Sequence, residues 1–209
     1  MEAEVVRDSL LYLAGVLDPM AGGPPLDHAR GEDTARRSLY YRYSREDKME
    51  FLTAFDAPGV EECYRRQESI VPQQALALEN SEFVWDKARR IARLLEADVG
   101  TAPAPFVTAA FEHVLGRTPA TAEREACERF LVRQELLLAD SINLTPFPLP
   151  PAPPAPPDAA FRKRVPGLPL ILAKAQPLPP VAPAREPAGR AREYLIHVLL
   201  NHNDFITVR

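Results

Sequence analysis

The chain has 209 residues, of which 46% are hydrophobic and 26% are charged, and its formal net charge at pH 7 is −4. This length is enough for one good core or two small ones, and without a basic excess the chain is not expected to bind nucleic acid. No apolar run reaches 18 residues, so the sequence predicts no transmembrane segment. Proline is the outlier, because 15 of the 23 prolines fall within residues 146–187.

The N-terminal part of the chain begins with a predicted amphipathic helix over residues 2–17. Its apolar residues repeat at helical spacing, with charged residues between them: Val6, Leu10, Leu13 and Leu17. Asp18-Pro19 ends this pattern. Residues 38–43, Ser-Leu-Tyr-Tyr-Arg-Tyr, are rich in aromatic residues and favour extended chain or a short strand, and residues 49–55 favour a short helix.

The central part of the chain predicts three more helices. Pro72 suits the first turn of a helix, and the pattern that follows runs to about residue 96, either as one helix or as two with a bend near Asn80-Ser81. A second helix, from about Phe106, ends at Gly116, a residue type that is common at helix C-termini. A third covers residues 121–141, and a last helix covers about 191–201.

Together these elements predict a mainly α fold, a compact helical domain of about five helices. Residues 36–70 are expected to be irregular, with possible short strands, and to wrap over the core. The chain then divides into a helical body over residues 1–145, a proline-rich insert over 146–187 and a last helix within 188–209 that packs back on the body. Consecutive prolines cannot donate ladder hydrogen bonds, so the insert is expected to be polyproline II or irregular.

The cysteines and histidines of this chain have no metal-binding spacing. Cys63 and Cys127 are 64 residues apart, with no Cys-x-x-Cys or haem-attachment motif, so they are either free thiols or a disulfide. His197 and His202 miss the i, i+4 spacing of a helical two-histidine site. We therefore predict no metal site and no cofactor in this chain.

Six short segments carry a family resemblance. They are Glu2–Asp8, Arg36-Arg37-Ser38-Leu39-Tyr40, Phe55-Asp56-Ala57-Pro58, Cys63–Asn80, Leu115-Gly116-Arg117-Thr118-Pro119 and Leu199–Phe205. In this order they resemble the domain of unknown function numbered 1553, which is found near the C-terminus of large planctomycete proteins that also carry cytochrome-c-like domains. The chain departs from the pattern at Gly59, where an acidic residue is usual, and at Glu79, which interrupts a usually apolar stretch.

The resemblance implies a helical domain of an exported cell-envelope protein, with a periplasmic or envelope location. Any haem would lie elsewhere in a longer parent protein. The implied partners are other domains of that parent or other envelope proteins. The resemblance implies no activity, and the sequence leaves the oligomeric state open.

Seven residues are candidates for binding, although each also has a structural interpretation: Arg37, Tyr40, Asp56, Arg66, Ser69, Gln74 and Asn80. We expect Arg66 to pair with Asp56 or Glu62 and to donate to loop carbonyls, because a guanidinium has five donors in a rigid fork. Gln74 and Asn80 are six residues apart, so each is expected to cap or tether a neighbouring loop. No catalytic residue is identified, although Ser69 with a distant histidine remains an open arrangement.

The leading hypothesis is a non-catalytic interaction or assembly domain. It follows from the missing catalytic motif, the proline-rich segment and the resemblance. One alternative is an enzyme that acts on polysaccharide through acids in a cleft. The other is a docking module for a redox partner.

Overall fold

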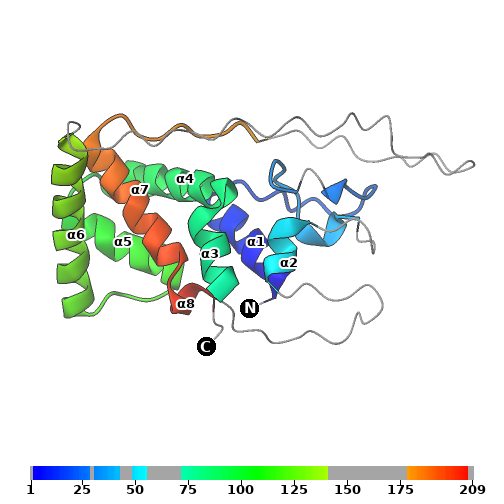
Figure 1. The fold of residues 1–209 in the computed structure, drawn as a ribbon, viewed down its shortest axis with the longest axis horizontal. Helices are drawn as coiled ribbons and strands as arrows, with labels where there is room; N and C mark the ends of the chain where they lie inside the picture. The colour runs from blue at the N-terminus through cyan, green and yellow to red at the C-terminus, as the bar shows by residue number, and fades with distance from the viewer. Residues whose placement is uncertain (1, 29–30, 43–48, 56–71, 141–177, 207–209) are drawn as a thin grey trace, which may run out of the picture.

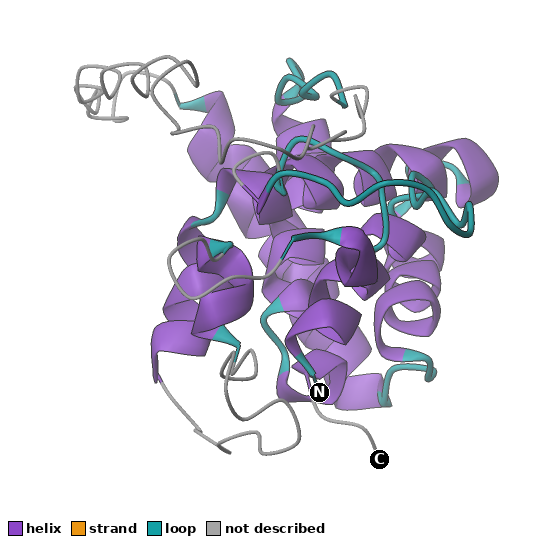
Figure 2. Ribbon diagram, turned by 90° about the vertical axis from the view of Figure 1, so that its right-hand side faces the viewer, coloured by secondary structure: helices purple, strands orange, loops and turns teal. Residues whose placement is uncertain are grey.

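The protein is described by a computed structural model over residues 2–28, 31–42, 49–55, 72–140 and 178–206. These residues form eight α-helices and one short 3-10 helix, and they contain no strand. Figure 2 shows the helices packed together with loops between them. The predicted mainly α fold is confirmed.

The first four helices are α1 (Ala3–Leu13), α2 (Glu50–Ala54), α3 (Pro72–Asn80) and α4 (Glu82–Val99). Helix α1 ends before the predicted residue 17, because Gly15 has a positive φ of 68°, a conformation that ends helices. The predicted helix from Pro72 is two helices, which was one of the two arrangements considered. Ser81, with φ −74° and ψ 122°, is extended and separates α3 from α4.

The remaining helices are α5 (Pro103–Leu115), α6 (Thr121–Ala139), α7 (Pro187–Leu200) and α8 (Asn203–Ile206). Gly116 adopts the left-handed conformation, with φ 65° and ψ 21°. It terminates α5 as the sequence predicts. Pro103 and Pro187 each stand at the start of a helix, where the missing N–H of proline costs nothing.

The short strand considered for residues 38–43 is wrong for Ser38–Tyr40, which form the 3-10 helix η2. Among the described residues, only two isolated bridges occur nearby, Asp18 with Arg36 and Leu26 with Tyr41. Tyr41 can pair with Leu26 at a single position, and one bridge is too little to build a sheet. Irregular chain over these residues agrees with the prediction for 36–70.

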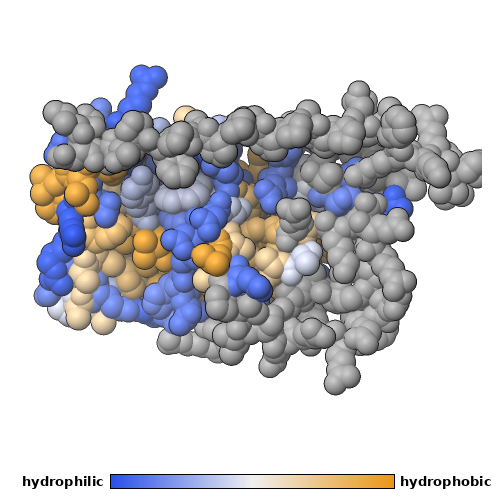
Figure 3. Space-filling model, viewed as in Figure 1, coloured by the Kyte–Doolittle hydropathy of each residue, from blue (hydrophilic) through white to orange (hydrophobic). Residues whose placement is uncertain are grey.

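Helix α7 packs against both α4 and α6, and Figure 1 shows α6 along one edge of the domain. The core takes apolar residues from α1, α2, α4, α5 and α7, among them Val6, Leu10, Phe51, Ile91, Phe106, Leu195 and Leu199. Leu131 is the one buried residue of α6. The outer face of α6 exposes Val132, Leu136 and Leu137, and Figure 3 shows hydrophobic residues gathered near the end of this helix.

Residues 178–186 have no regular secondary structure and extend along α4, as Figure 1 shows. We call residues 178–184 the strap. They belong to the predicted proline-rich insert, and the insert's residues 146–177 lie outside the described residues.

Cys127 is a half-buried free thiol, and Cys63 lies outside the described residues. Among the described helices, none is both long and apolar enough to cross a membrane.

Candidate functional site

The most polar buried position near the N-terminus is Arg7, whose side chain is fully buried. Arg7 shares one face of α1 with Ala3 and Leu10, and this face continues to Ala14, directly after the helix; all three are buried as well. These positions are spaced i, i+4, i+7 and i+11, so they follow a single stripe of the helix. The amphipathic pattern of α1 therefore carries a charged residue into the core.

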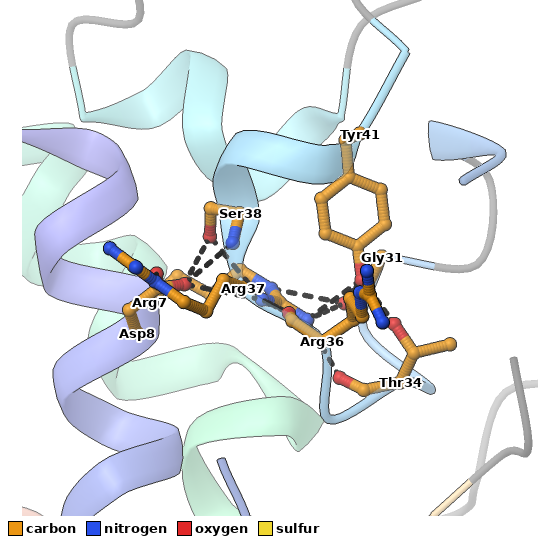
Figure 4. A network of polar contacts seen from close by, with 8 residues as sticks. All are labelled: Arg7, Asp8, Gly31, Thr34, Arg36, Arg37, Ser38 and Tyr41. Carbon is orange, nitrogen blue, oxygen red and sulfur yellow. Dashed lines mark hydrogen bonds and ion pairs between the residues drawn. The ribbon is translucent and has the colours of Figure 1, made fainter. Parts of the chain in front are cut away.

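The guanidinium of Arg7 donates to three carbonyls of the loop that follows α1 (Figure 4). Its Nε lies 3.1 Å from Gly31 O, its Nη1 2.8 Å from Arg36 O, and its Nη2 2.7 Å from Thr34 O. Nη2 also lies 2.9 Å from the hydroxyl oxygen of Tyr41. Carbonyls that have no ladder partner are thus satisfied by a single side chain.

Burial sets the electrostatics of this cluster. Desolvation lowers the pKa of Arg7, although Tyr41 and Asp8 act in the opposite direction. Burial likewise raises the pKa of Tyr41, which keeps its phenol protonated. The Tyr41 hydroxyl also contacts the hydroxyl of Thr34, and the Arg7 guanidinium lies 4.9 Å from the Tyr41 ring centroid. The guanidinium remains charged, because arginine is not deprotonated in proteins.

Asp8 connects α1 to η2. Its Oδ1 accepts from the backbone N of Ser38 at 2.8 Å and from Ser38 Oγ at 2.6 Å. Its Oδ2 lies 3.6 Å from Nε of Arg37. The predicted site residue Arg37 therefore forms an ion pair with a carboxylate that already supports the fold.

Tyr40, the second predicted site residue in this region, also has a structural role. Its hydroxyl accepts from the backbone N of Gly22 at 2.8 Å. The guanidinium of Arg36 lies 4.3 Å from its ring centroid, within the range of a cation–π contact. Tyr40 thus holds the loop that contains Gly22 against residues 36–40.

Two further predicted site residues, Gln74 and Asn80, lie on α3 and outside this cluster. Gln74 is half-buried on α3. Asn80 lies at the end of α3, where its Nδ2 donates to Leu76 O of the same helix at 3.0 Å. Asp56, Arg66 and Ser69 lie outside the described residues, and their roles stay predictions.

An open groove with a volume of about 800 Å³ lies beside this cluster. Its walls come from the N-terminal end and one face of α1 and from seven residues elsewhere in the chain, namely Leu17, Pro19, Arg37, Ser38, Leu39, Tyr41 and Leu52. Three apolar or aromatic side chains of the lining are well exposed, namely Val5 at 44%, Tyr12 at 71% and Leu39 at 55%. Four residues of the lining are charged, namely Glu2, Glu4, Asp8 and Arg37.

A second polar cluster joins two segments that carried the family resemblance. Arg117, just after α5, forms a bidentate pair with Glu123 of α6, at 2.8 Å and 2.7 Å. Its Nε donates to Asp204 Oδ2 of α8 at 2.9 Å. We call these three residues the clasp. Hydrogen bonds from Arg117 lower the pKa of Glu123 to about 2.

The described residues contain no group of three side chains suited to bind a metal ion. His197 is buried, and its ring stacks on Trp85 with the centroids 3.7 Å apart. Its Nε2 lies 3.2 Å from Leu78 O. Nδ1 of His202 accepts from the backbone N of Asp204 at 3.1 Å. Both rings therefore have structural contacts.

Arg7 and Asp8 were not among the predicted site residues. One signal in the sequence points to Arg7, which interrupts the apolar stripe of its helix at a position facing the core. Arg7 donates to loop carbonyls, which is the kind of contact predicted for Arg66. The role of Arg66 itself stays a prediction.

Comparison with known proteins gives one family. The family model described as protein of unknown function (DUF1553) matches residues 1–131. No curated protein matches the chain, and no solved structure does. The match covers α1 to α5 and most of α6. It therefore includes the groove and the polar cluster around Arg7, which we call the Arg7 cluster (Arg7, Asp8, Thr34, Ser38 and Tyr41).

Proposed function

Because the chain belongs to the DUF1553 family of proteins of unknown function, we propose that it is a non-catalytic interaction domain that binds a segment of a partner protein in the groove beside α1. The observation that carries this proposal is the lining of the groove. Exposed apolar side chains stand there beside acidic ones.

The charges of the groove indicate the chemistry of the partner. Three acidic residues and one arginine line it, and the arginine already pairs with one of the acids. Complementary charge favours encounter and discriminates between partners. A partner segment with apolar side chains flanked by lysine or arginine fits this lining, and an acidic segment does not.

Selection from a library of random 12-residue peptides displayed on phage tests this proposal. We expect the full chain to enrich peptides that combine apolar and basic residues. Val5→Asp and Leu39→Asp should abolish the binding of the enriched peptides, because each places a charge in the apolar lining. Leu136→Asp, at a 68% exposed position on α6 outside the groove, is the matched control and should bind normally.

Two outcomes of the selection would contradict the proposal. The first is the absence of any enriched basic and apolar peptide. The second is binding that survives Val5→Asp and Leu39→Asp in proteins whose circular dichroism shows the native helix content. Either result would show that the groove is not the interaction surface.

An envelope location and a parent protein with cytochrome-c-like domains also belong to this proposal. The resemblance of six ordered segments supports them, and the haem would then be bound by those other domains. Fractionation of cells that produce the natural protein tests the location. Recovery in the cytoplasmic fraction alone would contradict it.

A further inference from the structure

The backbone of the strap forms hydrogen bonds with side chains of α4 and α7. Arg89 Nη1 donates to Val181 O at 3.2 Å and Arg93 Nη2 to Ala182 O at 2.5 Å. Arg90 donates in the same way to the carbonyl of Pro179. Asp86, Arg89, Arg90 and Arg93 follow one face of α4 at spacings of three and four residues. We call this face, with Glu193 and Arg190 of α7, the strap site.

In the strap, every third residue donates a hydrogen bond through its backbone N–H. Leu178 N donates to Asp33 O at 2.6 Å, Val181 N to Asp86 Oδ1 at 2.6 Å, and Ala184 N to Glu193 Oε1 at 2.9 Å. The same three residues are half-buried, and the four between them are exposed. A period of three is that of the polyproline II helix. The strap site thus contacts one edge of such a helix.

A second segment of the chain repeats this pattern. Residues 177–184 read Pro-Leu-Pro-Pro-Val-Ala-Pro-Ala, and residues 148–155 read Pro-Leu-Pro-Pro-Ala-Pro-Pro-Ala, so six of the eight positions are identical. Proline lacks an N–H. In residues 148–155 the only residues with a backbone N–H are Leu149, Ala152 and Ala155. They align with Leu178, Val181 and Ala184, the three strap residues whose N–H groups donate hydrogen bonds.

We propose that the strap site is a binding site for polyproline II segments with an N–H at every third residue, and that residues 148–155 of the same chain are its second ligand, in competition with the strap. The arginines bind carbonyls, which every sequence has, so they do not distinguish the two segments. The acceptors Asp86 and Glu193 bind N–H groups, so they require the register that both segments share. Leu149 takes the half-buried place of Leu178.

Titration of a fluorescent peptide with the sequence of residues 146–157 onto the full chain tests the competition. In Val181→Pro the strap loses the N–H that Asp86 accepts but keeps a φ suited to polyproline II. In Val181→Pro/Ala152→Pro the second segment loses its central N–H as well. We expect affinity for the peptide to rise from wild type to Val181→Pro and again to the double variant, by at least about tenfold overall.

Two controls identify the site and the register. Arg93→Ala, at an exposed position of α4, should weaken peptide binding to the double variant several-fold, whereas Arg129→Ala, 72% exposed on α6, should not. A peptide with proline in place of Ala152 and Ala155 remains polyproline II but lacks the two N–H groups. It should bind at least about tenfold more weakly than the parent peptide.

Other outcomes overturn the proposal. Equal affinity of the two peptides would show that the register is not recognised. Equal affinity of Val181→Pro and the double variant for the parent peptide would show that residues 148–155 do not compete. If Val181→Pro sediments as a dimer while the double variant is a monomer, the second segment comes from a neighbouring copy, and the assignment to the same chain fails.

Discussion

Arg7 and Arg117 each hold distant parts of the chain together, but they stabilise the guanidinium charge in different ways. Arg7 is fully buried and donates mainly to neutral carbonyls, with the Asp8 carboxylate 3.6 Å away. Arg117 is 28% exposed and donates to two carboxylates. Burial makes each lost contact of Arg7 costly, whereas water can replace the contacts of Arg117. We therefore expect the fold to depend strongly on Arg7 and only weakly on Arg117.

The largest expected effect is that of Arg7→Ala. It leaves the buried carbonyls of Gly31, Thr34 and Arg36 without their donor, and each buried acceptor left without a partner typically costs about 1–3 kcal/mol. Arg7→Lys should recover only a minor part, because one ammonium cannot reproduce the fork. The free energy of unfolding, measured in urea through the fluorescence of Trp85, checks this.

Arg129→Ala is the control for Arg7, because this side chain is 72% exposed and its ion pair with Glu125 is long at 3.8 Å. It should change the unfolding free energy by less than about 0.5 kcal/mol. The comparison between the two arginine sites would fail if Arg7→Ala cost no more than this control.

The intermediate effect is the pH dependence of stability that is due to His197. Unlike arginine, this buried side chain can exist without its charge. Burial lowers the pKa of His197 from its ordinary value of 6.5. The unfolded state then binds more protons than the folded state below about pH 6.5, so stability falls as the pH falls through that range. The slope has a limit of about 1.4 kcal/mol per pH unit, which is that of one proton.

Urea unfolding of wild type and His197→Phe between pH 5 and 8 measures this slope. The variant retains an aromatic ring against Trp85 but has no titrating group, so its stability should vary less with pH over the same range. Identical pH profiles would show that His197 is not the group responsible. The absolute stability of the variant does not enter this comparison.

The smallest expected effect is that of the clasp. The folded pKa of Glu123, about 2, lies below its ordinary value of 4.5. The contribution of the clasp is therefore fully present above pH 4.5 and is lost as the pH falls toward 2. Because the clasp is partly exposed, Glu123→Gln should lower the Tm by less than either Arg7 variant, and salt should reduce the difference.

The difference in Tm between wild type and Glu123→Gln, measured from pH 7 down to pH 2, checks the sign. We expect it to shrink below pH 4.5. A difference that grows on acidification would contradict the assignment of the low pKa to Glu123.

Local sequence signals predict most of the helices. Pro72 and Gly116 mark helix ends through their own backbone preferences, and the spacing of residues such as Val84, Ile91 and Leu95 marks the buried face of α4. The strand considered at 38–43 was wrong at Ser38–Tyr40, because a strand depends on a partner far away in the sequence. Aromatic composition alone does not provide one.

The candidate site was less predictable, because its contacts are long-range. Arg37 and Tyr40 were selected, but their partners, Asp8 and Gly22, lie 29 and 18 residues away. Arg7 is not among the predicted residues, because a charged residue in an amphipathic pattern typically lies on the solvent face. Its burial follows from the carbonyls of residues 31–36, whose positions the sequence does not reveal.

The position of α7 has a consequence for the synthesis of the protein. This helix covers both α4 and α6, yet about 60 residues separate its end from the end of α6. At about 5–20 residues per second, a ribosome needs roughly 3–12 s to add them. During that interval the surfaces of α4 and α6 that contact α7 lack their cover. The nascent chain therefore passes through a state prone to aggregation, in which a holdase chaperone has a surface to bind.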